Sequence, residues 1–83
     1  MDIQQPIDVI CQFSSDGTII PLKLRFTDED GETNEYKVLS YRQKKSTLNQ
    51  VVSFDCKINY YNQIKIISIY FCCYEKKWYK NKM

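Results

Sequence analysis

Two residue types are missing from the 83-residue chain, and each absence excludes something. Without histidine, the chain lacks the side chain that most often transfers protons near neutral pH. Without alanine, it lacks the strongest helix former, and its other helix formers stand among β-branched and aromatic residues that suit strands. We therefore expect a protein that is built from strands and is not an enzyme.

The sequence also lacks the apolar segments that direct a chain into or through a membrane. Residues 1–6 contain neither the basic start nor the apolar centre of a signal peptide. The longest apolar run, residues 66–74, is far shorter than the roughly 20 residues of a membrane-spanning helix. We expect a cytoplasmic protein with no membrane partner, in which the four cysteines are free thiols.

Neither the cysteines nor the acidic residues have the spacing of a metal site. Structural zinc sites use cysteine pairs two to four residues apart, whereas Cys11 and Cys56 are isolated and Cys72 and Cys73 are adjacent. Neighbours on a strand point to opposite faces, so only one of the last two could join the others. The acidic run 28–32 does not match a calcium loop and is typical of a solvated turn. We expect no metal and no cofactor, and mostly buried thiols.

The net charge of +2 conceals two halves of opposite sign. Residues 1–35 hold eight acids and two bases, whereas residues 36–83 hold ten bases and two acids. Such a division indicates an anionic partner such as nucleic acid, or a fold that pairs its two halves.

Apolar and polar residues alternate along several segments, which is the pattern of half-buried strands. The alternation is regular over residues 7–13, 20–26 and 52–60. The first two of these strands are each followed by an Asp-Gly pair, at 16–17 and 30–31, and such pairs favour tight turns.

Other segments depart from simple alternation. Pro21 removes a backbone donor and predicts an edge position or a bulge. The pattern over residues 35–42 changes register, which predicts a bulge or burial on both faces. Residues 64–74 are apolar on both faces, so we expect cover on both sides. Residues 43–49 are polar and basic, as in a functional loop, and a short edge strand is expected at 78–79.

Five or six short antiparallel strands in so short a chain predict one all-β domain over residues 1–83. A small sheet of this kind is stable when it twists strongly or closes into a barrel, because closure removes exposed strand edges. We expect a small antiparallel barrel or strongly twisted sheet of the SH3-like or OB-like kind.

The most suggestive stretch for function is the basic and aromatic segment 74–82. Nucleic-acid bases stack on aromatic rings while lysines neutralise phosphates, a combination that suits single-stranded nucleic acid. The alternative is that Trp78 and Tyr79 close the core and the lysines keep this end in water.

Further candidates come from the strands and from the excess of tyrosine. We expect Lys23, Arg25, Lys57 and Lys65 to project from outer strand faces, and Tyr41, Tyr61 and Tyr79 to expose their rings. The alternative for the tyrosines is cross-strand packing. The complete candidate binding surface is Lys23, Arg25, Tyr41, Lys44, Lys45, Lys57, Tyr61, Lys65, Lys76, Lys77, Trp78, Tyr79 and Lys80.

The chain resembles a family of short uncharacterised proteins of low-GC Gram-positive bacteria. The resemblance lies in the strand and Asp-Gly turn of residues 6–10 and 13–25, which include Ile-Pro-Leu-Lys. It continues in Tyr-Lys-Val at 36–38, Phe-Asp-Cys at 54–56 and Trp78. These motifs are structural. Such proteins can be encoded beside Y-family DNA polymerases, so the resemblance implies a context of DNA repair.

Two functions follow as hypotheses. The first is a cytoplasmic accessory module that contacts nucleic acid, or a nucleic-acid enzyme such as a DNA-repair protein, through its basic second half. The second is a protein-interaction or homo-oligomerising β domain without nucleic-acid contact. One basic patch beside Trp78 would favour the first hypothesis, and scattered bases would favour a structural role for Trp78.

Overall fold

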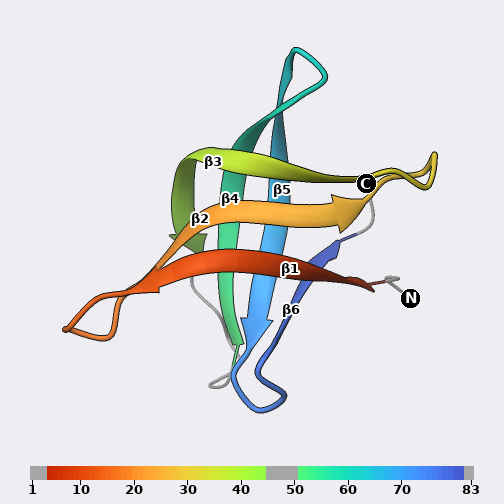
Figure 1. Cartoon of the computed structure of the whole chain (residues 1–83). Coiled ribbons are helices and arrows are strands. Elements are labelled where there is room, and N and C mark those ends of the chain that lie inside the picture. The colour runs from red at the N-terminus through yellow and green to blue at the C-terminus, as the bar shows by residue number, and fades with distance from the viewer. Residues whose placement is uncertain (1–3, 45–50, 82–83) are drawn as a thin grey trace.

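The computed structural model describes residues 4–44 and 51–81, which form six strands and no helix. The strands close in chain order into one antiparallel barrel, with the last strand returning to the first (Figure 1). This confirms the predicted small all-β barrel. The strands are β1 (Gln4–Phe13), β2 (Ile19–Thr27), β3 (Thr33–Lys44), β4 (Val51–Tyr60), β5 (Gln63–Cys72) and β6 (Lys77–Asn81).

Strand β3 belongs to both sides of the barrel. Its first residues, 33–37, pair with β2, and its later residues, from Val38 to Lys44, pair with β4. Strands β1 and β2 consequently run across β4, β5 and β6 at a steep angle (Figure 1). Because β3 takes part in both sheets, the few strands of this chain are enough to form two crossed sheets whose inner faces meet.

Two bulges allow the strands to bend, and both lie where the sequence predicts irregularity. On β2, Cys11 faces Pro21 while Ile10 faces Lys23, so Leu22 is the extra residue. On β3 the pairing shifts between Val38 and Ser40. A bulge turns the following side chains to the other face. Leu22 is therefore exposed, although simple alternation along residues 20–26 predicts that it points inward.

The core lies between the two crossed sheets and is largely apolar. The alternation predicted for residues 52–60 is confirmed, since Phe54, Cys56 and Ile58 are fully buried. Leu24 and Phe26 from β2 face them, as the alternation around these residues predicts. The buried set is Ile7, Leu24, Phe26, Tyr36, Phe54, Cys56, Ile58, Ile67 and Ile69.

The two predicted Asp-Gly turns are present and have the backbone conformation that favours glycine. Gly17 and Gly31 have φ angles of 89° and 81°. In the second turn, the Asp28 carboxylate accepts hydrogen bonds from the backbone N–H groups of Asp30 and Glu32, both at 3.0 Å. The loop expected over residues 43–49 begins with two residues that lie in β3, and its remainder falls outside the described residues.

The expectation that residues 64–74 are covered on both faces is wrong for the first half of β5. Ile64 and Ile66 are 61% and 60% exposed, because the outer face of this sheet has no second layer among the described residues. Ile67 and Ile69 point to the core, and the strand ends at Cys72. The continuous apolar run therefore combines one core face with an uncovered outer face.

Lys80 is the exception to the apolar interior. It faces the buried Ile69 across the β5–β6 ladder and is only 3% exposed. Its ammonium lies 4.8 Å from the centre of the Phe26 ring. Burial lowers the pKa of Lys80, because removal from water penalises the charged form. Lys80 was expected on the binding surface. That expectation is wrong, since the antiparallel pairing with β5 turns this residue inward.

Replacement of Lys80 by methionine is expected to stabilise the barrel by about 1 kcal/mol at neutral pH, since a buried charge gives way to an apolar chain of similar length. The advantage should shrink as the pH rises toward about 10.4, the ordinary lysine pKa, because the penalty for burying the charge then disappears. Urea unfolding at several pH values measures this difference. Lys37→Met, at an exposed position, is the matched control and should change stability by less than about 0.5 kcal/mol. A destabilised Lys80→Met variant would contradict the prediction.

Candidate functional site

The predicted candidate residues do not gather on one surface. Lys23 and Arg25 lie on the outer face of β2, and Lys57 lies on the outer face of β4. Lys65 was also expected to point outward, which is wrong. It faces the buried Ile58 across the β4–β5 ladder, so its side chain lies on the core side of the sheet. Lys45 lies outside the described residues.

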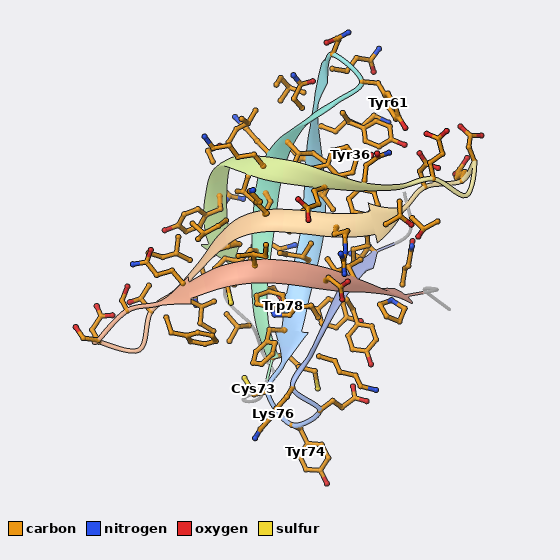
Figure 2. All side chains as sticks on the ribbon, in the orientation of Figure 1. Tyr36, Tyr61, Cys73, Tyr74, Lys76 and Trp78 are labelled. Atoms are coloured by element: carbon orange, nitrogen blue, oxygen red, sulfur yellow. The ribbon has the colours of Figure 1, made fainter. Side chains whose placement is uncertain are left out.

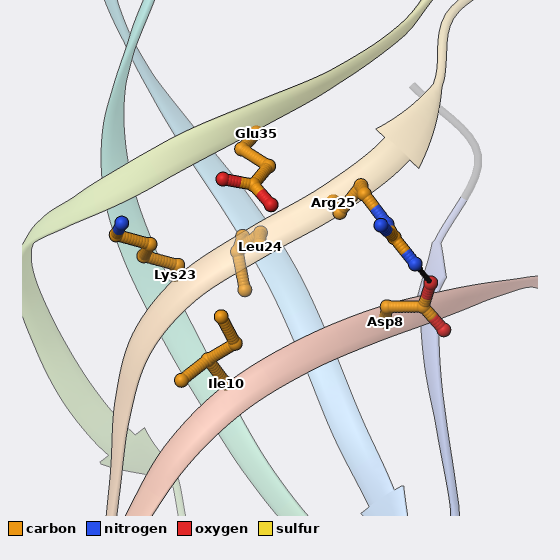
Figure 3. Close-up of a pocket in the computed structure, with 6 residues that line it drawn as sticks. All are labelled: Asp8, Ile10, Lys23, Leu24, Arg25 and Glu35. Carbon is orange, nitrogen blue, oxygen red and sulfur yellow. Dashed lines mark hydrogen bonds and ion pairs between the residues drawn. The ribbon is translucent and has the colours of Figure 1, made fainter.

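Arg25 is already bound to an acid. Its guanidinium donates two hydrogen bonds to Asp8 on β1, at 2.6 and 3.1 Å (Figure 3). These bonds raise the pKa of Arg25. Glu35 faces Arg25 on the other side, across the β2–β3 ladder. The hollow of about 140 Å³ beside these residues thus has acids among its bases, which makes it a poor site for an anion.

A second group of bases converges on Asp55. Lys44 Nζ lies 3.2 Å from one carboxylate oxygen of Asp55, and a guanidinium nitrogen of Arg42 lies 3.8 Å from the other. The Ser68 hydroxyl donates to Asp55 at 2.8 Å. The hydrogen bond from Ser68, followed by the contact with Lys44, lowers the pKa of Asp55. Lys44 therefore pairs within the β3–β4–β5 sheet.

The tyrosines divide between the two predicted roles. Tyr41 and Tyr61 are exposed, as expected. Tyr79 was expected to be exposed, but it is half-buried because its ring stacks on Tyr70 across the β5–β6 ladder at 5.5 Å. Its hydroxyl donates to Glu75 at 3.2 Å. Cross-strand packing thus accounts for Tyr79.

The remaining candidates meet where β1 and β6 separate. These strands pair only from Gln4 with Asn81 to Ile7 with Trp78. Beyond this last pair, β1 and the segment that leads into β6 are no longer paired with each other. Beyond the last pair lies a groove of about 410 Å³. Its lining residues are Pro6, Ile7, Asp8, Val9, Lys76, Lys77, Trp78 and Tyr79. We call this hollow the β1–β6 groove.

Trp78 lines the β1–β6 groove and also packs against the core. Its ring packs at 5.0 Å from Phe71 and 6.2 Å from Phe54, so one part closes the core. The residue remains partly exposed and lines the groove. Figure 2 shows the Trp78 side chain just below β1 in that view. Trp78 therefore combines the core role and the surface role that the sequence leaves open.

Lys76 and Lys77 stand at the end of the β1–β6 groove. Both are exposed. Lys76 lies in the turn after β5 (Figure 2), and Lys77 is the first residue of β6. The Lys76 N–H donates to the carbonyl of Cys72 at 2.7 Å, and Lys76 has a φ of 58°. Within residues 4–44 and 51–81, neither lysine forms an ion pair. Asp8, on the opposite wall, is bound to Arg25.

Two of the four thiols, those of Cys11 and Cys56, offer little reactivity. Cys56 is fully buried, and burial followed by the charge of Asp55 raises its pKa to about 12. Burial also raises the pKa of Cys11, so both sulfurs stay protonated at neutral pH. Cys73 is exposed in the β5–β6 turn. Across the described ranges, no three Cys, Asp or Glu side chains come together as ligands of one metal ion.

Comparison with protein-family models, with curated proteins and with solved structures finds no match for this chain. The described residues include no helix that is long and apolar enough to cross a membrane.

Sequence reasoning missed the second wall of the β1–β6 groove. Pro6, Ile7 and Val9 read as ordinary residues of a first strand, and no local pattern marks them. They become part of a site because β6, more than 65 residues later, pairs with the start of β1 and then leaves it. The aromatic and basic half of the site carries a visible sequence signal, and the apolar wall carries none.

Asp55→Asn is expected to destabilise the protein by about 1 kcal/mol at neutral pH, since the amide cannot replace the charge that Lys44 and Arg42 face. Because the folded-state pKa of Asp55 is lowered, its contribution is present above the ordinary aspartate pKa of about 3.9 and disappears as the pH falls through the folded value. Urea unfolding at neutral pH and near pH 2 tests this. Asp30→Asn, at an exposed turn position, is the control. An equal loss at both pH values would refute the role of the charge.

Proposed function

We propose that this chain is a small cytoplasmic binding module that takes single-stranded nucleic acid in the β1–β6 groove. The observation that carries the proposal is the meeting of Trp78 with Lys76 and Lys77 in one groove of about 410 Å³. A partly exposed indole offers a stacking surface for a base, and two lysines without ion pairs in the described chain suit the adjoining phosphates.

The geometry favours a single strand over a duplex. The indole lines a groove together with Pro6 and Val9. Bases within a duplex are already stacked on each other, so their faces are not free to stack on an indole inside a groove. A single strand can turn a base into the groove while its backbone follows the lysines at the rim.

The proposed role is accessory and not enzymatic. Small SH3-like and OB-like barrels commonly present one binding surface on a rigid frame, and the β1–β6 groove has that character. The chain contains no histidine to transfer protons. The thiols of Cys11 and Cys56, whose pKa values are raised, are not nucleophiles at neutral pH. A DNA-repair context, which the family resemblance implies, is consistent with a module that follows single-stranded DNA.

The alternative function is a protein-interaction or self-associating domain without nucleic-acid contact. The dispersal of the bases favours it, because Arg25, Arg42 and Lys44 are all engaged by carboxylates within the barrel. Exposed aliphatic side chains on β5 also favour it, since isoleucine offers no stacking surface for a base.

The single tryptophan provides a direct test of nucleic-acid binding. Addition of an oligothymidylate to the full chain at low salt is expected to quench the fluorescence of Trp78, because a stacked base contacts the indole. The affinity should fall steeply with added salt. Lys76→Gln combined with Lys77→Gln should lower the affinity and reduce the slope of log affinity against log salt by about 1.4, as loss of two single-strand phosphate contacts requires.

The matched control is Lys23→Gln combined with Lys37→Gln, which removes the same charge from the outer face of β2 and β3. This variant should retain the slope of the unmodified protein. Binding that both double variants weaken equally would indicate general charge attraction and overturn the assignment to the β1–β6 groove. No quenching and no binding at low salt would end the nucleic-acid proposal.

A further inference from the structure

Tyr74 is the most exposed large apolar side chain in the described part of the molecule. Its exposed fraction is 82%, and the next in order is Phe13 with 64%. Tyr74 stands in the turn of residues 73–76, between the end of β5 and the start of β6. Across the described ranges, no other aromatic ring packs on it. Solitary exposed side chains are ordinary, so the surroundings of Tyr74 decide whether its ring has a role.

The turn brings Tyr74 close to the lysines at the end of the β1–β6 groove. It is a tight turn, because the Lys76 N–H donates to the carbonyl of Cys72 at 2.7 Å. Figure 2 shows Tyr74 and Lys76 at the same end of the barrel, with Trp78 nearer to β1. Trp78 follows Tyr74 by four positions, so their Cα atoms lie at most about 14 Å apart. One short strand of nucleic acid can therefore reach both rings.

The charges of the turn are arranged to receive a phosphate backbone between the two rings. Neither of the lysines that separate the rings forms an ion pair within the described residues. Glu75 is the one acid of the turn. Its carboxylate accepts a hydrogen bond from the Tyr79 hydroxyl at 3.2 Å, and Glu75 is not among the residues that line the groove. From the turn into β6, the side chains beside the path of a strand are therefore Tyr74, Lys76, Lys77 and Trp78.

We propose that Tyr74 is a second stacking residue of the nucleic-acid site. One base stacks on Trp78 in the β1–β6 groove, the backbone passes the two lysines, and a further base stacks on Tyr74 beyond the end of the groove. Every base has a π-face, so the contact with Tyr74 requires no particular base. The inference rests on the proposed function and adds the size of the ligand, which is a strand of several nucleotides and not a single nucleotide.

The test compares a mononucleotide with a strand, on the full chain at low salt, with the fluorescence of Trp78 as the readout. Thymidine monophosphate should bind much more weakly than an oligothymidylate of about eight nucleotides, because it can contact only one ring. Tyr74→Ser should weaken binding of the oligonucleotide about tenfold, as the loss of one stacked base requires. It should leave the affinity for the mononucleotide unchanged. The quenching at saturation should also persist, because a base still stacks on Trp78.

Two further variants separate stacking from other effects of the substitution. Tyr74→Phe keeps the ring without its hydroxyl and should bind the oligonucleotide within about twofold of the unmodified protein. Phe13→Ser removes an exposed ring at the end of β1, outside the groove, and is the matched control. Its affinity for the oligonucleotide should be that of the unmodified protein.

The outcomes distinguish this inference from the proposed function. If Trp78 is quenched and Tyr74→Ser binds the oligonucleotide as well as the unmodified protein does, the role of Tyr74 is overturned and the groove remains the binding site. A loss in Tyr74→Phe or in Phe13→Ser as large as in Tyr74→Ser would overturn it too, as would an equal loss for the mononucleotide. If the unmodified protein shows neither quenching nor binding, the proposed function itself fails.

Discussion

Four residue pairs, from Gln4 with Asn81 to Ile7 with Trp78, join the last strand to the first, and the rest of the molecule depends on them. They close a sheet whose edges would otherwise be exposed, and they bring Ile7 against the core. The same pairing places Trp78 over Phe54. Because it is short, it also leaves an opening where the two strands part, so closure and the candidate groove have one cause.

The described ion pairs form within each charged half of the sequence, not between the two halves. Arg25 binds Asp8 within the acidic first half, while Arg42 and Lys44 share Asp55 in the basic second half. A carboxylate beside each of these cations offsets its charge, so the cation attracts an anionic ligand less strongly. What remains beside the indole is the pair Lys76 and Lys77, held at the rim by a turn with one left-handed residue. The proposed binding surface is therefore much smaller than the basic half of the sequence suggests.

The parts of the candidate site that follow from local pattern were predictable. Trp78, Lys76 and Lys77 adjoin each other in the sequence, so their proximity needs no knowledge of the fold. Lys65 and Lys80 were placed on the wrong side because neither lies in a segment with clear alternation. Their orientation depends on Ile58 and Ile69, the residues that face them across the ladder. The apolar wall of the groove had no local signal at all.

The sequence by itself determined the strands, the two Asp-Gly turns and the core face of residues 52–60, because side-chain alternation and positive φ angles are properties of neighbouring residues. It also indicated an edge position or a bulge at Pro21, and a bulge or burial on both faces over residues 35–42, and the structure has a bulge at both places. Only the tertiary structure decided which bases are paired, that Ile64 and Ile66 lie uncovered and that a groove opens beside Trp78. These properties depend on which distant strand lies alongside, and a pattern with a period of two residues carries no information about that partner.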